Sequence, residues 1–282
     1  MGTAMARKAD ASQTDRVPFV DAGFQIYVSS LLKVAEQATP RPSSAPLCDG
    51  GTLTCGEALA LFDAQLESRH VDYASRHLKK RGASFYTISS AGHEGNAAVA
   101  AALRPGDPAF LHYRSGGFFC ARAQQAGYEH AARDMLLGVA ASAEEPIAGG
   151  RHKVFGSVPL AIPPQTSTIH SHLPTAVGAA FALSRARRIG IDTQATAPGC
   201  MSVAPDAVVV CSFGDASANH STAVGAIHAA CWAAFQGQHI PFLFVCEDNG
   251  LGISVPTPAR WIESAYGNRP GLTYFAGDGL DL

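Results

Sequence analysis

The sequence lacks any hydrophobic run long enough to cross a bilayer. Its longest uninterrupted apolar segments, residues 97–103 and 229–235, fall well short of the ~20 residues that a spanning helix needs. Arg7 and Lys8 lie near the N-terminus, but the small-residue cleavage pattern of a secretion signal does not follow them. These absences predict a cytoplasmic protein with no membrane partner.

Paired cysteines and concentrated positive charge are missing as well. The seven cysteines form no C-x-x-C pair, and Cys211 and Cys246 lie inside apolar runs, which indicates reduced thiols in the core. The formal net charge is -2 and basic clusters such as Lys79–Arg81 are short, so no nucleic-acid partner is expected. The absence of G-x-G-x-x-G after a predicted strand, and of G-x-x-x-x-G-K-[ST], disfavours nicotinamide and P-loop nucleotide sites.

Length and composition favour one main core with an appendage. Of the 282 residues, 47% are hydrophobic and 16% are charged, which is typical of a globular protein with a generous interior or with an apolar surface covered by a partner. Residues 1–52, which include a short amphipathic piece at 19–38 and a proline-rich tract at 40–46, are expected to form an arm. Residues 53–282 are expected to form the main domain.

Apolar periodicity and turn residues predict a series of helices and strands. Thr54 and Glu57 form a capping-box pattern at the start of a helix of about 25 residues that ends near Gly82. Residues 149–165 lack a clear period and are interpreted as a functional loop. Further helices are predicted at 92–103, 117–125, 128–137, 172–188, 221–235 and near Trp261, and strands at 109–112, 207–213, 241–246 and 273–276.

A strand, crossover helix and strand unit is the most informative part of the sequence. The apolar runs 207–213 and 241–246 flank the helix predicted at 221–235. Two strands joined in this way should be parallel and buried on both faces. The fold class predicted is therefore α/β, with a parallel sheet and helices on both faces.

Both strands of this unit end in oxygen-bearing residues. Gly214-Asp215-Ala216-Ser217 follows the first strand and Glu247-Asp248-Asn249-Gly250 follows the second. Ligands of parallel sheets bind beyond these carboxyl ends, and carboxylate and amide oxygens suit Mg²⁺ when it anchors a phosphorylated cofactor. Either dipeptide alone is also a common turn, so the pairing of the two carries the prediction.

The stretch GDAS...CEDNGLGIS resembles the thiamine-diphosphate motif, which begins Gly-Asp-Gly and ends Asn-Asn. Upstream segments occur in the order seen in alpha subunits of the 2-oxo acid dehydrogenases: FYTISSAGHEGNAAVAAALRPGD, HYRSGG, AGGRH and SHLPTAVGAAFAL. The resemblance covers about residues 55–282. It implies a thiamine-diphosphate-binding fold of which this chain forms the domain that binds the diphosphate and Mg²⁺.

The resemblance also implies roles for particular residues. Asp215, Asn249 and the Leu251 carbonyl would bind Mg²⁺, and Tyr113 and Arg114 would contact the diphosphate. The guanidinium fork of Arg114 matches phosphate oxygens in any case. The other residues implied at the cofactor are Gly214, Ala216 and Ser217 of the motif, and Ser167 and Ile169 near the pyrimidine and the central region.

Several polar residues near these segments have open roles. His170 and His172 flank Ser171 beside the expected pocket and would suit proton transfer near neutral pH, although a helix-capping or core role is equally consistent. His93 and Glu94 lie at a helix start, where capping and packing are the favoured interpretation. Arg151 and His152 lie in a glycine-rich loop and are candidates for contact with substrate or a lipoyl group.

The sequence departs from the family pattern in four places. Ala216 replaces a glycine, which is sterically tolerable only if its φ is negative. Asp248 stands where the first asparagine of the closing pair is usual, and the 34 positions from Asp215 to Asn249 exceed the usual spacing. The family continues with a helix, a strand and a site histidine beyond the position of Leu282, so the sequence resembles the front part of a longer protein.

The function implied is decarboxylation of a 2-oxo acid followed by acyl transfer to a lipoyl group, with thiamine diphosphate and Mg²⁺ as cofactors. The implied partners are a beta subunit, as in a heterotetramer, or a fused pyrimidine-binding half, and a lipoyl-bearing acyltransferase. No activating glutamate is evident, so the isolated chain is expected to be inactive. The alternatives are a transketolase-like or acetoin-cleaving thiamine enzyme, and a non-catalytic assembly fragment.

Overall fold

The protein is described from a computed structural model, which covers residues 16–35, 39–84, 88–151, 155–194 and 199–281. The chain divides into two compact units, Met1–Gly56 and Glu57–Leu282. In the first unit the described residues form α1 (Arg16–Ala35) and a segment closed by an antiparallel bridge between Pro46 and Thr54. None of the described helices is both long and apolar enough to cross a membrane.

The predicted helices are present, and one of them is shorter than expected. The exception is α3 (Asn96–Ala101), which was expected to begin at Gly92. Residues 91–95 form turns instead, in which Gly92 has φ +87 and Glu94 accepts a hydrogen bond from the Gly92 N–H at 2.7 Å. The other α-helices described are α2 (Cys55–Lys80), α4 (Gly116–Ala126), α5 (Ala131–Val139), α6 (Leu173–Ile189), α7 (Ser221–Phe235) and α8 (Trp261–Tyr266).

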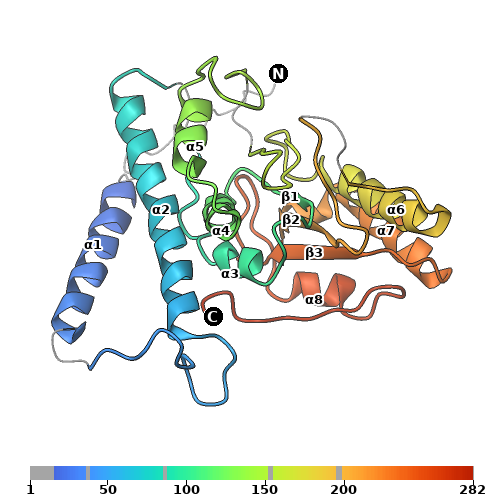
Figure 1. Ribbon diagram of the computed structural model, residues 1–282, viewed down its shortest axis with the longest axis horizontal. Helices are drawn as coiled ribbons and strands as arrows, with labels where there is room; N and C mark the ends of the chain where they lie inside the picture. Colours follow the sequence, from blue (N-terminus) through green and yellow to red (C-terminus); the bar gives the residue numbers. More distant parts are fainter. Residues whose placement is uncertain (1–15, 36–38, 85–87, 152–154, 195–198, 282) are drawn as a thin grey trace, which may run out of the picture. The chain divides into compact units, whose positions relative to one another are not determined.

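The described sheet has three parallel strands in the order β1-β2-β3. They are β1 (Ala109–Phe110), β2 (Val209–Gly214) and β3 (Phe242–Glu247), and α7 is the crossover helix between β2 and β3 (Figure 1). The register pairs Val210 with Ala109 on one side and Gly214 with Glu247 on the other. The prediction of an α/β chain with a parallel crossover unit is confirmed.

The core lies on one face of β2, beneath α6 and α7. Val209, Cys211 and Phe213 alternate along the strand and pack with the buried faces of both helices, which lie side by side in Figure 1. Burying side chains of this size stabilises the fold by about 1.5–3 kcal/mol each. Val210 and Ser212 lie on the opposite face, because side chains of a strand alternate between its two faces.

The predictions about the other strands are partly wrong. β3, an edge strand of the described sheet, was expected to be buried on both faces, but Leu243 is 41% exposed and the other residues of the strand are only partly buried. β1 has two residues rather than the four expected at 109–112. Residues 273–276 form no strand, since none of the described strands pairs with them.

Candidate functional site

Asp215 lies directly after β2, at the carboxyl end of the sheet, and is 1% exposed. Its Oδ1 accepts a hydrogen bond from the Ala216 N–H at 2.7 Å, and its Oδ2 accepts one from the Gly250 N–H at 2.8 Å. The second bond joins the end of β2 to the loop that follows β3. The two motif ends predicted from the sequence are therefore adjacent in space.

The loop after β3 folds back tightly against Asp215. The Asn249 Oδ1 accepts a hydrogen bond from the Leu251 N–H at 2.9 Å, and Gly250 has φ +73, a left-handed conformation that favours glycine. A Cβ on Gly252 would lie 2.8 Å from the Ala216 Cβ, so the methyl group of Ala216 requires a glycine opposite it. The Leu251 side chain points outward and is 75% exposed.

Ala216 adopts the conformation that the sequence argument required. Its φ is -63, which an alanine tolerates without strain. The crossover helix begins at Ser221, as predicted, and not directly after Asp215. A 3₁₀ turn, η1 (Ser217–Asn219), comes first, and α7 begins at Ser221 after His220, whose Nδ1 accepts the Thr222 N–H as a cap.

The Mg²⁺ ligands implied by the resemblance form a suitable donor set for a hard cation. Asp215 and Asp248 have no ion-pair partner among the residues that the structure describes, and burial together with the charge of Asp215 raises the pKa of Asp248. Each carboxylate or amide oxygen that accepts one N–H retains a second lone pair. A cation here would offset the negative charge of the two aspartates. Its ligands would be oxygen atoms, which Mg²⁺ prefers.

Tyr113 and Arg114 follow β1 at the same end of the sheet. Tyr113 is 8% exposed, and the Arg114 guanidinium lies 5.3 Å from the centre of its ring. The Arg114 Nη1 donates a hydrogen bond to the Ser89 carbonyl at 2.6 Å, and none of the other described residues accepts a hydrogen bond from the remaining guanidinium nitrogens, which could donate to an anion.

A small cavity lies beside Tyr113, between α2, α5 and the segment around Ser90. Its volume is about 30 Å³, which is enough for a water molecule and too small for an organic substrate. Ser68 lines it, and the buried Oγ of Ser68 has no hydrogen-bond partner among the described residues. The cavity is therefore a site for water.

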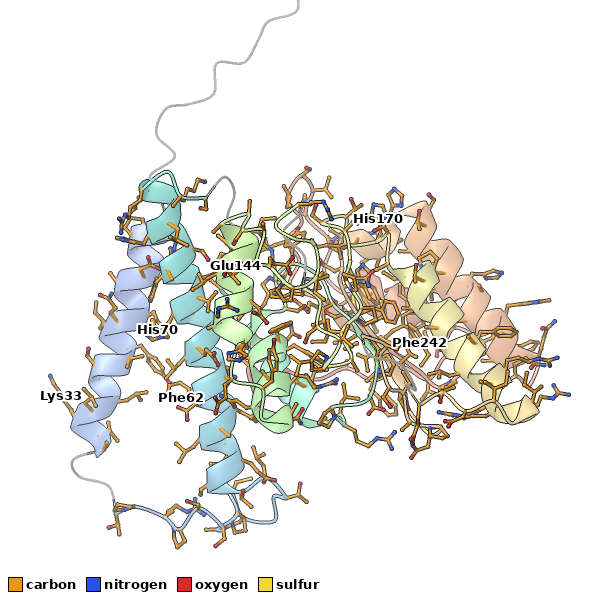
Figure 2. All side chains as sticks on the ribbon, turned by 45° about the horizontal axis from the view of Figure 1, so that its top comes forward. Lys33, Phe62, His70, Glu144, His170 and Phe242 are labelled. Atoms are coloured by element: carbon orange, nitrogen blue, oxygen red, sulfur yellow. The ribbon has the colours of Figure 1, made fainter. Side chains whose placement is uncertain are left out.

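The segment before α6 carries the other predicted cofactor residues. Ile169 packs against the core beside β2. His170, labelled in Figure 2, stacks on the ring of His220 with 3.4 Å between ring centres, and burial and His220 lower its pKa. His172 is 2% exposed and its Nε2 donates to the Ser212 carbonyl at 2.8 Å. This environment favours the core role for His172.

The lowered pKa of His172 predicts that the fold loses stability in acid. Burial lowers its pKa from 6.5 to about 4, although the bond to Ser212 opposes the shift. Because the folded-state pKa is the lower one, the stabilisation is complete above about pH 6.5 and is lost as the pH falls towards about 4. Over this interval the free energy of unfolding should fall by about 3 kcal/mol more in wild type than in His172→Gln, which does not titrate. Urea titrations at several pH values measure this, and equal slopes would contradict it.

Glu247, the last residue of β3, is the centre of a partly buried polar cluster that the sequence analysis missed. Its carboxylate accepts hydrogen bonds from His93 Nδ1, from His112 Nε2 at 2.6 Å, from Asn96 Nδ2 at 2.8 Å and from Ser212 Oγ at 3.1 Å. Burial alone would raise the pKa of Glu247, but the bonds from the two histidines outweigh it and hold the pKa well below 4.5. Glu247 is therefore ionised near neutral pH.

The other polar residues singled out in the sequence lie apart from this cluster or outside the described residues. Glu94 is held by Arg69 and by the Gly92 N–H, in the turn before α3. The predicted capping role is wrong, because the N-cap of α3 is Gly95 and no side chain caps it. Arg151 is exposed and lies in the loop before residue 155. His152 falls outside the residues that the structure describes.

Comparison with known proteins identifies the family of the chain. The sequence pattern of the family described as "Dehydrogenase E1 component" matches residues 63–272, which is most of the chain. The 2-oxoisovalerate dehydrogenase subunit alpha of Bacillus subtilis (strain 168) is 27% identical over 242 residues, which cover 82% of this chain and 64% of that protein. The chain thus spans less than two thirds of the length of this relative. The chain belongs to the dehydrogenase E1 component family.

Proposed function

We propose that this chain is the alpha-type part of a thiamine-diphosphate-dependent 2-oxo acid dehydrogenase. It would supply the domain that binds the diphosphate and Mg²⁺ in a thiamine-diphosphate-binding fold. The observation that carries the proposal is the 2.8 Å hydrogen bond from the Gly250 N–H to Asp215, which brings together the beginning and the end of the cofactor motif. Membership of the dehydrogenase E1 component family supports the same reading.

Different residues of the site would contact different parts of the cofactor and its metal ion. Asp215, Asn249 and the Leu251 carbonyl would bind Mg²⁺, and Tyr113 and Arg114 would contact the diphosphate. The backbone of Gly214, Ala216 and Ser217 would approach the same group, and Ser167 and Ile169 would lie near the rest of the cofactor. When bound, thiamine diphosphate supplies the carbanion chemistry of decarboxylation, while the protein orients it and excludes water.

The proposed partners complete the reaction. A beta subunit or a fused second half would supply the pyrimidine side of the site, and a lipoyl-bearing acyltransferase would receive the acyl group. The substrate would be a 2-oxo acid, and the similarity to the 2-oxoisovalerate dehydrogenase subunit of Bacillus subtilis makes 2-oxoisovalerate the first to test.

Calorimetry and an activity assay test the proposal together. The assembly that contains this chain should bind thiamine diphosphate with Mg²⁺ and lose that binding when EDTA removes the cation. It should then decarboxylate 2-oxoisovalerate or pyruvate with an artificial electron acceptor, and transfer the acyl group to a lipoyl domain. Failure to bind the cofactor would refute the proposal. Turnover without acyl transfer to the lipoyl domain would favour the transketolase-like or acetoin-cleaving alternative.

Arg114→Lys should weaken cofactor binding by about tenfold although the charge is retained, because lysine cannot reproduce a planar, two-point contact with phosphate. Calorimetric titration of the assembly measures the change in Kd. Arg188→Lys is the matched control, since Arg188 is exposed on the last turn of α6. If both variants bind like wild type, Arg114 makes no such contact.

A further inference from the structure

Three polar side chains from distant segments converge beside the sheet: His93, His112 and Glu247. Each offers a possible metal ligand, and the three ligand atoms lie within 4.8 Å of one another. Two histidines and one carboxylate commonly hold a transition metal. The hydrogen bonds of His112 argue against this use. Its Nδ1 accepts the Arg114 backbone N–H at 3.1 Å, so the ring proton lies on Nε2, where a metal would need a lone pair.

The carboxylate of Glu247 is engaged by four donors from other segments of the chain. His112, Asn96 and Ser212 donate to Oε1, which saturates its lone pairs, and His93 donates to Oε2. The side chain is 15% exposed, so these bonds are only weakly screened by water. An acid held in this way organises its neighbours instead of reacting.

Glu247 connects two separate parts of the candidate site. One part is the end of β3, where Glu247 lies two residues before Asn249. The other part is the segment after β1, where the His112 Nε2 donates to Glu247 and the Arg114 backbone N–H donates to the His112 Nδ1. Two consecutive hydrogen bonds therefore run from the end of β3 to the backbone of Arg114.

We propose that Glu247 is a positioning residue that, through His112, holds Arg114 where it meets the diphosphate of the cofactor. The inference rests on the proposed function. The rigid link removes the need to order the Arg114 backbone when the cofactor binds, so its loss should reduce affinity. Turnover of the saturated site should change little, because Glu247 is not among the proposed contacts with cofactor or substrate.

Two substitutions interrupt the link at different points. Glu247→Gln replaces the acceptor by an amide, which cannot accept all four hydrogen bonds. His112→Gln can keep a donor for Glu247 at the place of Nε2, but it has no acceptor at the place of Nδ1, where the Arg114 N–H is bound. Asp134→Asn is the matched control. Asp134 lies on α5, its carboxylate is buried, and it accepts a hydrogen bond from the Tyr128 hydroxyl at 2.5 Å.

Each link variant should raise the Kd for thiamine diphosphate with Mg²⁺ by about tenfold in calorimetry of the assembly. The double variant should bind about as weakly as either single one, because both remove the same link. The kcat at saturating cofactor should stay within about twofold of wild type, and Asp134→Asn should leave the Kd unchanged. If Glu247→Gln does not fold, the Kd and kcat of His112→Gln test the same proposal.

The possible failures are distinguishable. If wild type shows no Mg²⁺-dependent binding, the proposed function falls and the inference falls with it. If wild type binds and the link variants match wild type in Kd, only the positioning role is overturned. A similar loss of affinity in Asp134→Asn, or a fall in kcat without a change in Kd, would indicate general structural damage and would also overturn it.

Discussion

Asp215→Ala is expected to abolish Mg²⁺-dependent binding of thiamine diphosphate, with a rise in Kd of at least about a thousandfold, or about 4 kcal/mol. Asp215 is the only carboxylate among the three proposed metal ligands, so its removal takes away the negative charge that attracts the cation. It also leaves the N–H groups of Ala216 and Gly250 without their acceptor. Calorimetry of the assembly with saturating MgCl₂ measures the change.

Two further variants separate charge from structure in this test. Asp215→Asn keeps an oxygen for the backbone N–H groups but loses the charge, and should still cost at least about a hundredfold in affinity. Asp192→Ala is the control. Asp192 lies after α6, its side chain is exposed, and among the described residues it accepts a hydrogen bond only from the Gln194 N–H. Cofactor affinity unchanged in Asp215→Ala, with the fold intact by circular dichroism, would refute the metal site.

The second large effect concerns stability. Arg122 is fully buried on α4, and its Nη1 donates hydrogen bonds to the carbonyl oxygens of Pro105, Asp107 and Leu160 at 2.9–3.1 Å. Arg122→Met should lower the free energy of unfolding by about 4 kcal/mol, because methionine fills much of the volume but leaves three buried carbonyls without a donor. Urea denaturation of the assembly at neutral pH provides the measurement.

Lysine at the same position is the informative comparison. Burial lowers the pKa of Arg122 to about 10, so the side chain is still charged at neutral pH. Arg122→Lys retains a charged donor but reaches fewer carbonyls, and should cost about 2 kcal/mol. A loss below about 1 kcal/mol in Arg122→Met would mean that water replaces the guanidinium at these carbonyls.

Local sequence signals predicted the elements that depend on neighbours along the chain. The bounds of α7 were predicted correctly, because an alanine-rich run lies between two apolar strands and the polar residues on either side mark its ends. The exposure of β3 was not predictable in this way. An apolar strand has the same composition at the edge of a sheet as in its centre, and its position depends on which strand lies beside it.

The same distinction applies to the candidate site. Asp215 and the loop at Asn249 were predicted to be adjacent because one crossover unit places the ends of both parallel strands at one edge. The cluster around Glu247 was missed because nothing periodic connects His93 and His112 with a residue at the end of β3. Each of these residues already had a local explanation as part of a turn or a motif, so no sequence pattern grouped them.

The Glu247 cluster also sets the time at which this site can form during synthesis. Ser212 precedes Glu247 by 35 residues, whereas His112 precedes it by 135 and His93 by 154. A ribosome that adds about 5–20 residues per second needs roughly 7–27 s to travel from His112 to Glu247. During that interval His112 has no carboxylate to bind, and closing so long a loop is among the slower steps of folding. A nascent chain that already contains β1, α4 and α6 therefore still lacks the hydrogen bond from His112 to Glu247, and it gains this bond only after β3 has been made.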